Sequence, residues 1–146
     1  MNKEKWLRVA DDADYSHVFY HKFHRWPPTV NTIWRNVGGT SKLSARAREF
    51  YSDMNHLVLD ARAHWADLPR TPLCGYLSVQ IRLYPPDKRP RDADNHVKAV
   101  WDAMTHAGIW HDDEQVKHYS VDMSPVTEKG GAFEIWISRM RWGEDA

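Results

Sequence analysis

Residues 90–113 read Pro-Arg-Asp-Ala-Asp-Asn-His-Val-Lys-Ala-Val-Trp-Asp-Ala-Met-Thr-His-Ala-Gly-Ile-Trp-His-Asp-Asp, and the rest of the chain is organised around them. Residues four apart share one face of a helix, so Asp94, Lys98 and Asp102 would form one charged stripe. The opposite side would be apolar and would face a core, through Val97, Val100, Trp101 and Met104. Gly108 is well placed to end this helix in a left-handed turn.

Two acidic pairs frame the predicted helix, with Asp92 and Asp94 before it and Asp112 and Asp113 after it. If the turn that follows the helix folds back, four carboxylates and the Lys98 ammonium converge. Crowded like charges are costly unless a cation or a shared proton offsets them. Oxygen ligands of this kind suit hard ions, so we expect Mg²⁺, with Mn²⁺ as a possible substitute. Any one aspartate could instead cap a helix, and the other acids could be solvated surface.

Bulk composition narrows the class of protein. A length of 146 residues with 42% hydrophobic residues predicts one folded domain. The single cysteine, Cys74, excludes an intrachain disulfide and fits a reducing compartment. No apolar run reaches the roughly 18–20 residues of a membrane span, and the first residues lack a signal-peptide core, so a cytoplasmic protein without membrane contact is expected. The net charge of zero argues against strong non-specific binding of nucleic acid.

Hydrophobic periodicity predicts an α+β fold. A polar N-terminal extension, 1–14, would precede a single domain, 15–146. The expected elements follow a β-α-β-α-β-β order, with a mixed or antiparallel sheet and helices packed on one face. They are strands at 17–24, 73–84, 115–123 and 131–140 and helices at 44–65 and 95–107. Residues 29–43 are interpreted as a long connection, which is either a loop that touches a phosphate backbone, through Arg35 among others, or a surface excursion.

Three blocks within residues 84–126 make the chain similar to a known family. They are Arg-Asp-Ala-Asp-Asn-His-Val-Lys, Trp-Asp-Ala-Met and Ala-Gly-Ile-Trp-His-Asp-Asp-Glu-Gln-Val. In these blocks the chain resembles the RusA-like Holliday junction resolvases. The resemblance extends more weakly to Trp26-Pro27-Pro28 with Asn31, and to Pro125-Val126-Thr127 ahead of Gly130-Gly131. Ala93 departs from the family, which commonly has a larger aliphatic residue there.

The resemblance implies a metal-dependent, structure-selective endodeoxyribonuclease that resolves Holliday junctions by paired symmetric nicks in DNA recombination and repair. The family's three catalytic aspartates match Asp92, Asp94 and Asp113, which would also be the metal ligands, and its catalytic lysine matches Lys98. These residue types suit the chemistry, because carboxylate-bound ions activate water and a lysine can stabilise charge on the phosphoryl oxygens. Paired cuts in a twofold-symmetric junction imply a homodimer with two sites.

Further residues are assigned supporting roles. Asp102 and Asp112 are expected to orient the metal ligands. Contacts to DNA are expected from Lys88, Arg89, Arg91, Asn95 and Arg35; alternatively, the basic residues beside the cluster only balance its charge. Two other functions stay open: a catalytically silent protein that binds branched DNA, and a magnesium nuclease with broader specificity for branched DNA.

Overall fold

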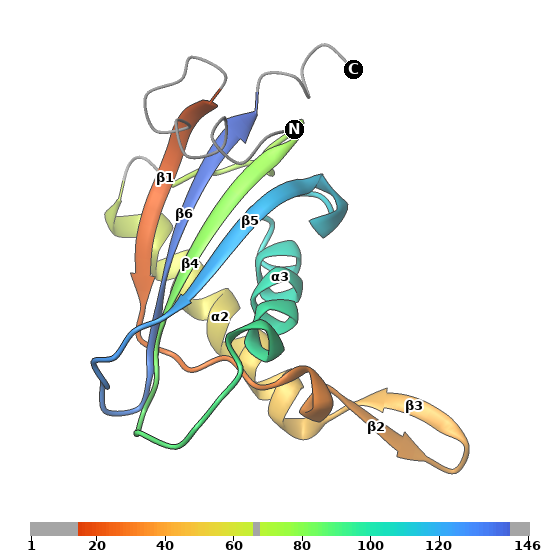
Figure 1. The fold of residues 1–146 in the computed structure, drawn as a ribbon. Helices are drawn as coiled ribbons and strands as arrows, with labels where there is room; N and C mark the ends of the chain where they lie inside the picture. The colour runs from red at the N-terminus through yellow and green to blue at the C-terminus, as the bar shows by residue number, and fades with distance from the viewer. Residues whose placement is uncertain (1–14, 66–67, 141–146) are drawn as a thin grey trace.

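The computed structural model describes residues 15–65 and 68–140, so the predicted extension 1–14 lies outside the described residues. Its centre is a four-stranded sheet in the order β1-β6-β4-β5 (Figure 1). The strands are β1 (Tyr15–Phe23), β4 (Leu77–Tyr84), β5 (Val116–Met123) and β6 (Ala132–Met140). β6 runs antiparallel to β1 and β4, whereas β4 and β5 are parallel, so the sheet is mixed, as predicted.

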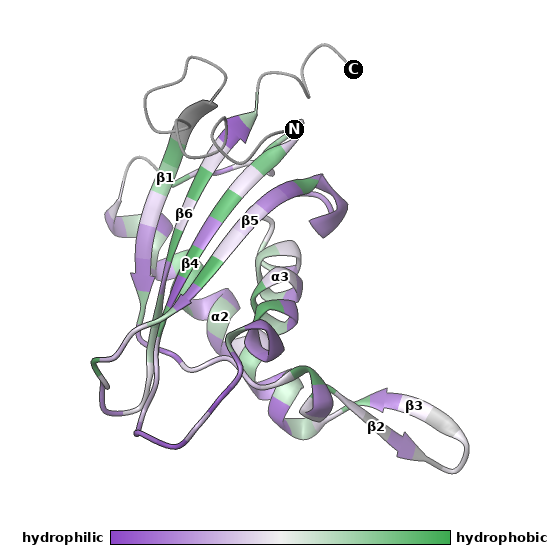
Figure 2. Ribbon diagram, in the orientation of Figure 1, coloured by the Kyte–Doolittle hydropathy of each residue, from purple (hydrophilic) through white to green (hydrophobic). Residues whose placement is uncertain are grey.

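The alternating sequence of β4 places its apolar side chains on one face of the sheet. These residues are at most 1% exposed, whereas their neighbours in the strand are partly exposed, and the alternation is visible in Figure 2. The buried set is Leu77, Val79, Ile81 and Leu83. Phe133, Ile135 and Ile137 of β6 are also fully buried, so the two central strands supply one side of the core.

Two helices, α2 (Ala45–His64) and α3 (Val97–His106), cover this face of the sheet (Figure 1). Ser44 caps α2, because its Oγ accepts a hydrogen bond from the backbone N–H of Ala47 at 3.1 Å. The apolar stripe predicted for the second helix is buried, through Val97, Val100, Trp101 and Met104. The α+β class, the β-α-β-α-β-β order and the one-sided helical layer are therefore confirmed.

The predicted connection at 29–43 contains more regular structure than expected. A 3-10 turn, η2 (Val30–Thr32), leads into a hairpin of β2 (Trp34–Val37) and β3 (Thr40–Leu43), which projects away from the sheet (Figure 1). The two turn residues, Gly38 and Gly39, have φ angles of +59° and +81°, and positive φ at both positions is what a tight two-residue hairpin requires.

None of the helices in the described part of the chain combines the length and the apolar composition needed to cross a membrane.

Candidate active site

The first acidic pair lies where the chain leaves the β4 loop and starts to coil. Asp92 is extended, with φ −91° and ψ 123°, and occupies the N-cap position of a 3-10 turn, η3 (Ala93–His96). The backbone N–H of Asn95 closes this turn by donating to the Asp92 carbonyl at 3.2 Å. Asp94 is therefore inside a 3-10 turn of four residues, whereas Asp92 is extended.

Both of these carboxylates are free of protein partners. Asp92 and Asp94 are exposed, and the side chain of neither one forms a hydrogen bond or an ion pair with any residue in 15–65 or 68–140. Their oxygen lone pairs are available to a ligand, and carboxylate oxygens are the donors that hard divalent ions prefer. The pair therefore has the donor chemistry of a Mg²⁺ or Mn²⁺ site.

The chain reverses after α3 as the glycine pattern predicted. Gly108 has a φ of +72°, and its N–H donates to the Thr105 carbonyl at 3.1 Å. The N–H of Ile109 donates to the Met104 carbonyl at 3.0 Å. These two bonds form the Schellman end of a helix, which a left-handed glycine permits. The reversal carries the second acidic pair back along the helix.

Lys98 connects the helix to the returning chain. Its Nζ lies 2.9 Å from Asp102 Oδ1, one helical turn away, and 3.1 Å from Asp113 Oδ2 at the start of η4 (Asp113–Gln115). The hydrogen bond with Asp102, and then that with Asp113, raises the pKa of the Lys98 ammonium. The lysine is therefore a fixed cation between two carboxylates.

Tyr51 is a site residue that the sequence analysis missed. It belongs to the buried face of α2, and its hydroxyl donates to Asp102 Oδ2 at 3.0 Å. Burial, followed by the hydrogen bond to the Asp102 carboxylate, raises the pKa of the tyrosine. Asp102 thus holds Lys98 with one oxygen and Tyr51 with the other, so its visible contacts orient the lysine. No local sequence signal identifies a pair 51 positions apart.

Asp112 is used by the turn itself. Its Oδ1 accepts a hydrogen bond from the Glu114 N–H at 2.9 Å, and this bond lowers the pKa of the carboxyl group. Gln115 completes a capping box with Asp112. The Gln115 amide also donates to the carbonyls of Leu73 at 2.8 Å and Gly75 at 3.0 Å. The Asp112 carboxylate and the Gln115 amide therefore anchor the second acidic turn beside the entry to β4.

The three aspartates expected to share an ion are not gathered into one group. Among the residues that the structure describes, no three His, Cys, Asp or Glu side chains are placed to hold a metal ion together. The reversal at Gly108 brings Asp113 to Lys98. Asp92 and Asp94 remain free before the helix, so the donor set has the right chemistry without a preformed cage.

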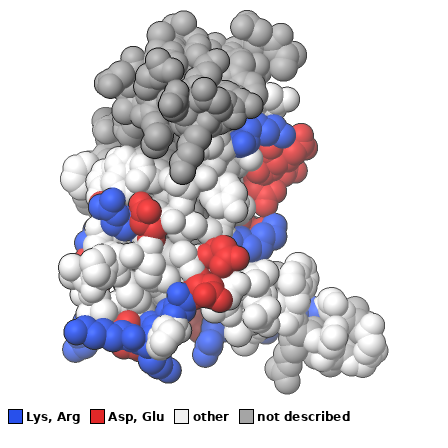
Figure 3. Space-filling model, in the orientation of Figure 1, with Lys and Arg blue, Asp and Glu red and all other residues white. Residues whose placement is uncertain are grey.

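The predicted DNA contacts differ in their surroundings. Lys88 is exposed, and Arg89 is 81% exposed but pairs with Asp87 at 2.8 Å. Arg91 also pairs with Asp87 at 2.8 Å, and its guanidinium lies 5.5 Å from the centre of the Trp26 ring. The two arginines depress the pKa of the Asp87 carboxyl, Arg89 most of all. Lys and Arg side chains gather at the lower end of the molecule, where the loop after β4 lies (Figure 3).

Two other predicted contacts lie on different elements. Asn95 lines a cavity together with Arg89, Arg91 and Asp92. Arg35 lies in β2, on the projecting hairpin, and its side chain is outside the described part of the structure.

Comparison with known proteins shows the family of this chain. Residues 25–138 match the family model described as endodeoxyribonuclease RusA. The chain belongs to the endodeoxyribonuclease RusA family. It is 36% identical over 121 residues to the crossover junction endodeoxyribonuclease of Enterobacteria phage 82, which covers 83% of this chain and 95% of the relative. The crossover junction endodeoxyribonucleases of Escherichia coli K12 and Shigella sonnei Ss046 are each 36% identical over 115 residues, or 79% of this chain and 90% of theirs.

The match to the RusA family includes every residue of the described site. Asp92, Asp94, Lys98 and Asp113 all lie within the matched range, as does Tyr51. The resemblance seen in the sequence blocks is therefore confirmed at the level of the family.

Proposed function

We propose that this member of the RusA family is a metal-dependent endodeoxyribonuclease that cuts four-way DNA junctions by paired symmetric nicks. The relatives named above are crossover junction endodeoxyribonucleases. The single observation that carries the proposal to this chain is the state of Asp92 and Asp94. Neither has a hydrogen-bond or ion-pair partner within 15–65 or 68–140, and both lie just ahead of a lysine that is held in place.

Each side chain of the site has a role in this proposal. Asp92, Asp94 and Asp113 would hold Mg²⁺, or Mn²⁺ in its place. The bound ion would supply an activated water at neutral pH and offset charge at phosphorus. Lys98 would stabilise negative charge on the phosphoryl oxygens, because its ammonium is held charged and in place by Asp102.

The symmetry of the substrate supports a homodimer. A four-way junction presents two equivalent strands for cutting, and one chain supplies one set of acidic residues. A twofold pair of subunits would match this symmetry with two sites. Because most contacts would be made to phosphates, binding should weaken steeply as the salt concentration rises.

The test is cleavage of a synthetic four-way junction with Mg²⁺, compared with duplex and single-stranded DNA. We expect two symmetric nicks in the junction, and we expect Asp94→Asn to abolish them while junction binding is largely kept. Unchanged cleavage by Asp94→Asn would contradict the site. Tight binding without cleavage in Mg²⁺ or Mn²⁺ would favour the silent binding protein, and equal cutting of other branched DNA would favour the broader nuclease.

A further inference from the structure

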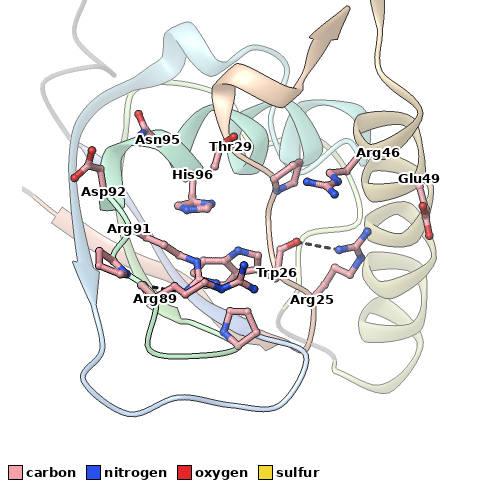
Figure 4. Close-up of a pocket in the computed structure, with 13 residues that line it drawn as sticks. Arg25, Trp26, Thr29, Arg46, Glu49, Arg89, Arg91, Asp92, Asn95 and His96 are labelled. Atoms are coloured by element: carbon pink, nitrogen blue, oxygen red, sulfur yellow. Dashed lines mark hydrogen bonds between the residues drawn. The ribbon is translucent and has the colours of Figure 1, made fainter.

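A cavity of about 970 Å³ opens beside Asp92 (Figure 4). Its walls come from the segment after β1, from the N-terminal part of α2, and from the loop that joins β4 to η3. The side chains that matter to its chemistry are Arg25, Trp26, Arg46, Arg89, Asn95 and His96. Of the four residues matched to the family's catalytic positions, Asp92 alone lines this cavity, so the other lining residues have no assigned catalytic role.

Arginines outnumber carboxylates among the residues that line the cavity. Four arginines line it, against the two carboxylates of Glu49 and Asp92. Three of these arginines are paired with carboxylates outside the lining: Arg25 with Asp53 at 2.9 Å, and Arg89 and Arg91 with Asp87 at 2.8 Å each. Arg46 forms no hydrogen bond or ion pair with any of the described residues, so its guanidinium is free to meet a ligand.

The position of Arg46 is unfavourable for the helix that carries it. It is the second residue of α2, and the first turn of this helix contains no acidic residue. Unsatisfied N–H groups and the helix dipole make the N-terminus of a helix positive, so a cation placed there lowers helix stability. The same end of a helix attracts phosphate groups. An unpaired arginine at this position is costly to the fold and useful to anion binding.

His96 gives a second, independent sign of a ligand. Its side chain is 1% exposed, lines the cavity and lies 4.7 Å from the Trp26 ring. Nδ1 must be the donor in its 2.8 Å hydrogen bond to the Pro27 carbonyl. In the neutral ring, a hydrogen on Nδ1 leaves Nε2 as an acceptor. Nε2 has no hydrogen-bond partner among the described residues.

These two features require different groups from the ligand. A phosphate satisfies Arg46 but offers no hydrogen to an acceptor, whereas the amino group of a nucleobase does. A nucleotide carries both groups. Asp92 shares the cavity wall with Arg89 and Asn95, so a nucleotide held there would be next to the reacting phosphate.

We propose that this cavity binds one nucleotide of the cleaved strand, adjacent to the scissile phosphate, and that Arg46 and Arg89 hold its phosphate from opposite walls. The inference rests on the proposed function, because it assumes a DNA strand at Asp92. It adds a binding site to which α2 contributes through Arg46, a residue outside the sequence blocks that carry the family resemblance.

Arg48 provides a matched control for Arg46. It lies in the same first turn of α2, carries the same charge and is exposed, but it is not part of the cavity wall. Its guanidinium donates to the Leu43 carbonyl at 3.2 Å. Arg46→Gln and Arg48→Gln therefore change the net charge equally, and each removes a cation from the first residues of α2. Neither variant should have a lower melting temperature by more than a degree or two, since each removes a cation from a positive helix end.

The experiment measures binding of a four-way junction by fluorescence anisotropy, without divalent ions, over a series of salt concentrations. Arg46→Gln should weaken binding by roughly tenfold and reduce the salt slope by about one, as expected for the loss of one phosphate contact. Arg48→Gln should stay within about twofold of the wild type. Neutral methylphosphonate is then placed at single positions near the cut. At the position next to the scissile phosphate it should weaken binding of the wild type more than binding of Arg46→Gln, in which only the contact with Arg89 is left to lose.

The outcomes separate this inference from the proposed function. If the wild type cuts the junction and the two glutamine variants bind equally, the cavity is not a nucleotide site and the nuclease proposal stands. If the wild type binds but never cuts, the nuclease proposal fails and the comparison of Arg46 with Arg48 still decides the inference. Additive effects of Arg46→Gln and every methylphosphonate would also overturn the inference. A wild type that binds no DNA overturns both.

Discussion

The two acidic pairs at the ends of α3 have the same residue type and opposite surroundings. Asp92 and Asp94 lie before the helix, and their side chains form no hydrogen bond or ion pair with the residues that the structure describes. After the helix, Asp112 accepts a backbone hydrogen bond in its own turn, and Asp113 pairs with Lys98. The first pair is therefore available to bind an ion, whereas the second pair shapes the turn and holds Lys98.

The largest expected difference between the two pairs is obtained by substituting one residue of each pair. Asp92→Asn should reduce junction cleavage by at least roughly a hundredfold, the scale of losing one group that stabilises transition-state charge. It should leave the melting temperature unchanged, because the carboxylate has no protein partner. Asp112→Ala should instead lower the melting temperature by a few degrees through the lost cap, with a much smaller loss of cleavage.

The matched measurement is thermal unfolding alongside single-turnover cleavage for both variants. Asp112→Asn is the control for the cap, because asparagine also caps helices and should restore the melting temperature. The distinction between the pairs is wrong if Asp112→Ala is as inactive as Asp92→Asn at full stability.

Tyr51→Phe tests how Lys98 is held in place. Loss of the hydroxyl removes the hydrogen bond that holds Asp102, which in turn holds Lys98. We expect cleavage to fall by roughly tenfold, as for groups that orient an active-site residue from outside. The free energy of unfolding should fall by about 1 kcal/mol, the usual net value of one hydrogen bond. Single-turnover rates and urea unfolding check both numbers.

A purely structural role for Tyr51 would lower stability without a change in the cleavage rate of the folded enzyme. A second readout is the pKa of Lys98, which the two carboxylates raise. Because the hydrogen bond with Asp102 is the larger cause, a poorly held Asp102 should let this pKa fall in Tyr51→Phe. An unchanged pKa by NMR titration would show that the tyrosine does not act through the lysine.

The last expected effect is on stability alone and concerns His96, which is buried and follows Asp94 by two residues. Burial lowers its pKa below the ordinary value of 6.5, and nearby Arg91 adds to the shift. The unfolded chain therefore binds a proton more readily, and stability is lost as the pH falls from about 6.5 towards the folded-state pKa. Between pH 7.5 and 5.5 the wild type should lose up to about 1.4 kcal/mol more stability than His96→Leu.

Urea unfolding of both proteins at the two pH values measures this difference. The comparison within one pair of proteins is needed because burial also lowers the pKa of His21 and His118. Equal losses in the wild type and in His96→Leu would mean that the ring titrates as it does in the unfolded chain.

Most of the fold follows from local patterns. The alternation in β4 and the three-and-four spacing in α2 are strong because one face of each element is buried. The hairpin at Trp34–Val37 and Thr40–Leu43 was missed because its strands are short and project from the core, so no buried face imposes a pattern. The glycine pair at its turn was the only available signal.

The site was predictable in its residues and less so in its geometry. The spacing of Lys98 and Asp102 predicted their shared helical face, and Gly108 predicted the reversal. Asp94 was expected on a helical stripe with Lys98 and Asp102 but lies in a 3-10 turn ahead of α3, and a turn of four residues leaves no hydrophobic periodicity. Tyr51 was missed because its partner comes from another helix, and only tertiary structure brings the two together.

The most direct test of the central claim is a Mn²⁺ titration followed by NMR, in which the paramagnetic ion broadens the signals of nearby residues. The account predicts that the signals of Asp92 and Asp94 are lost first, that Asp94→Asn abolishes this loss, and that Asp112→Ala does not. Early broadening at Asp112 that persists in Asp94→Asn, with Asp92 and Asp94 unaffected, would contradict the account.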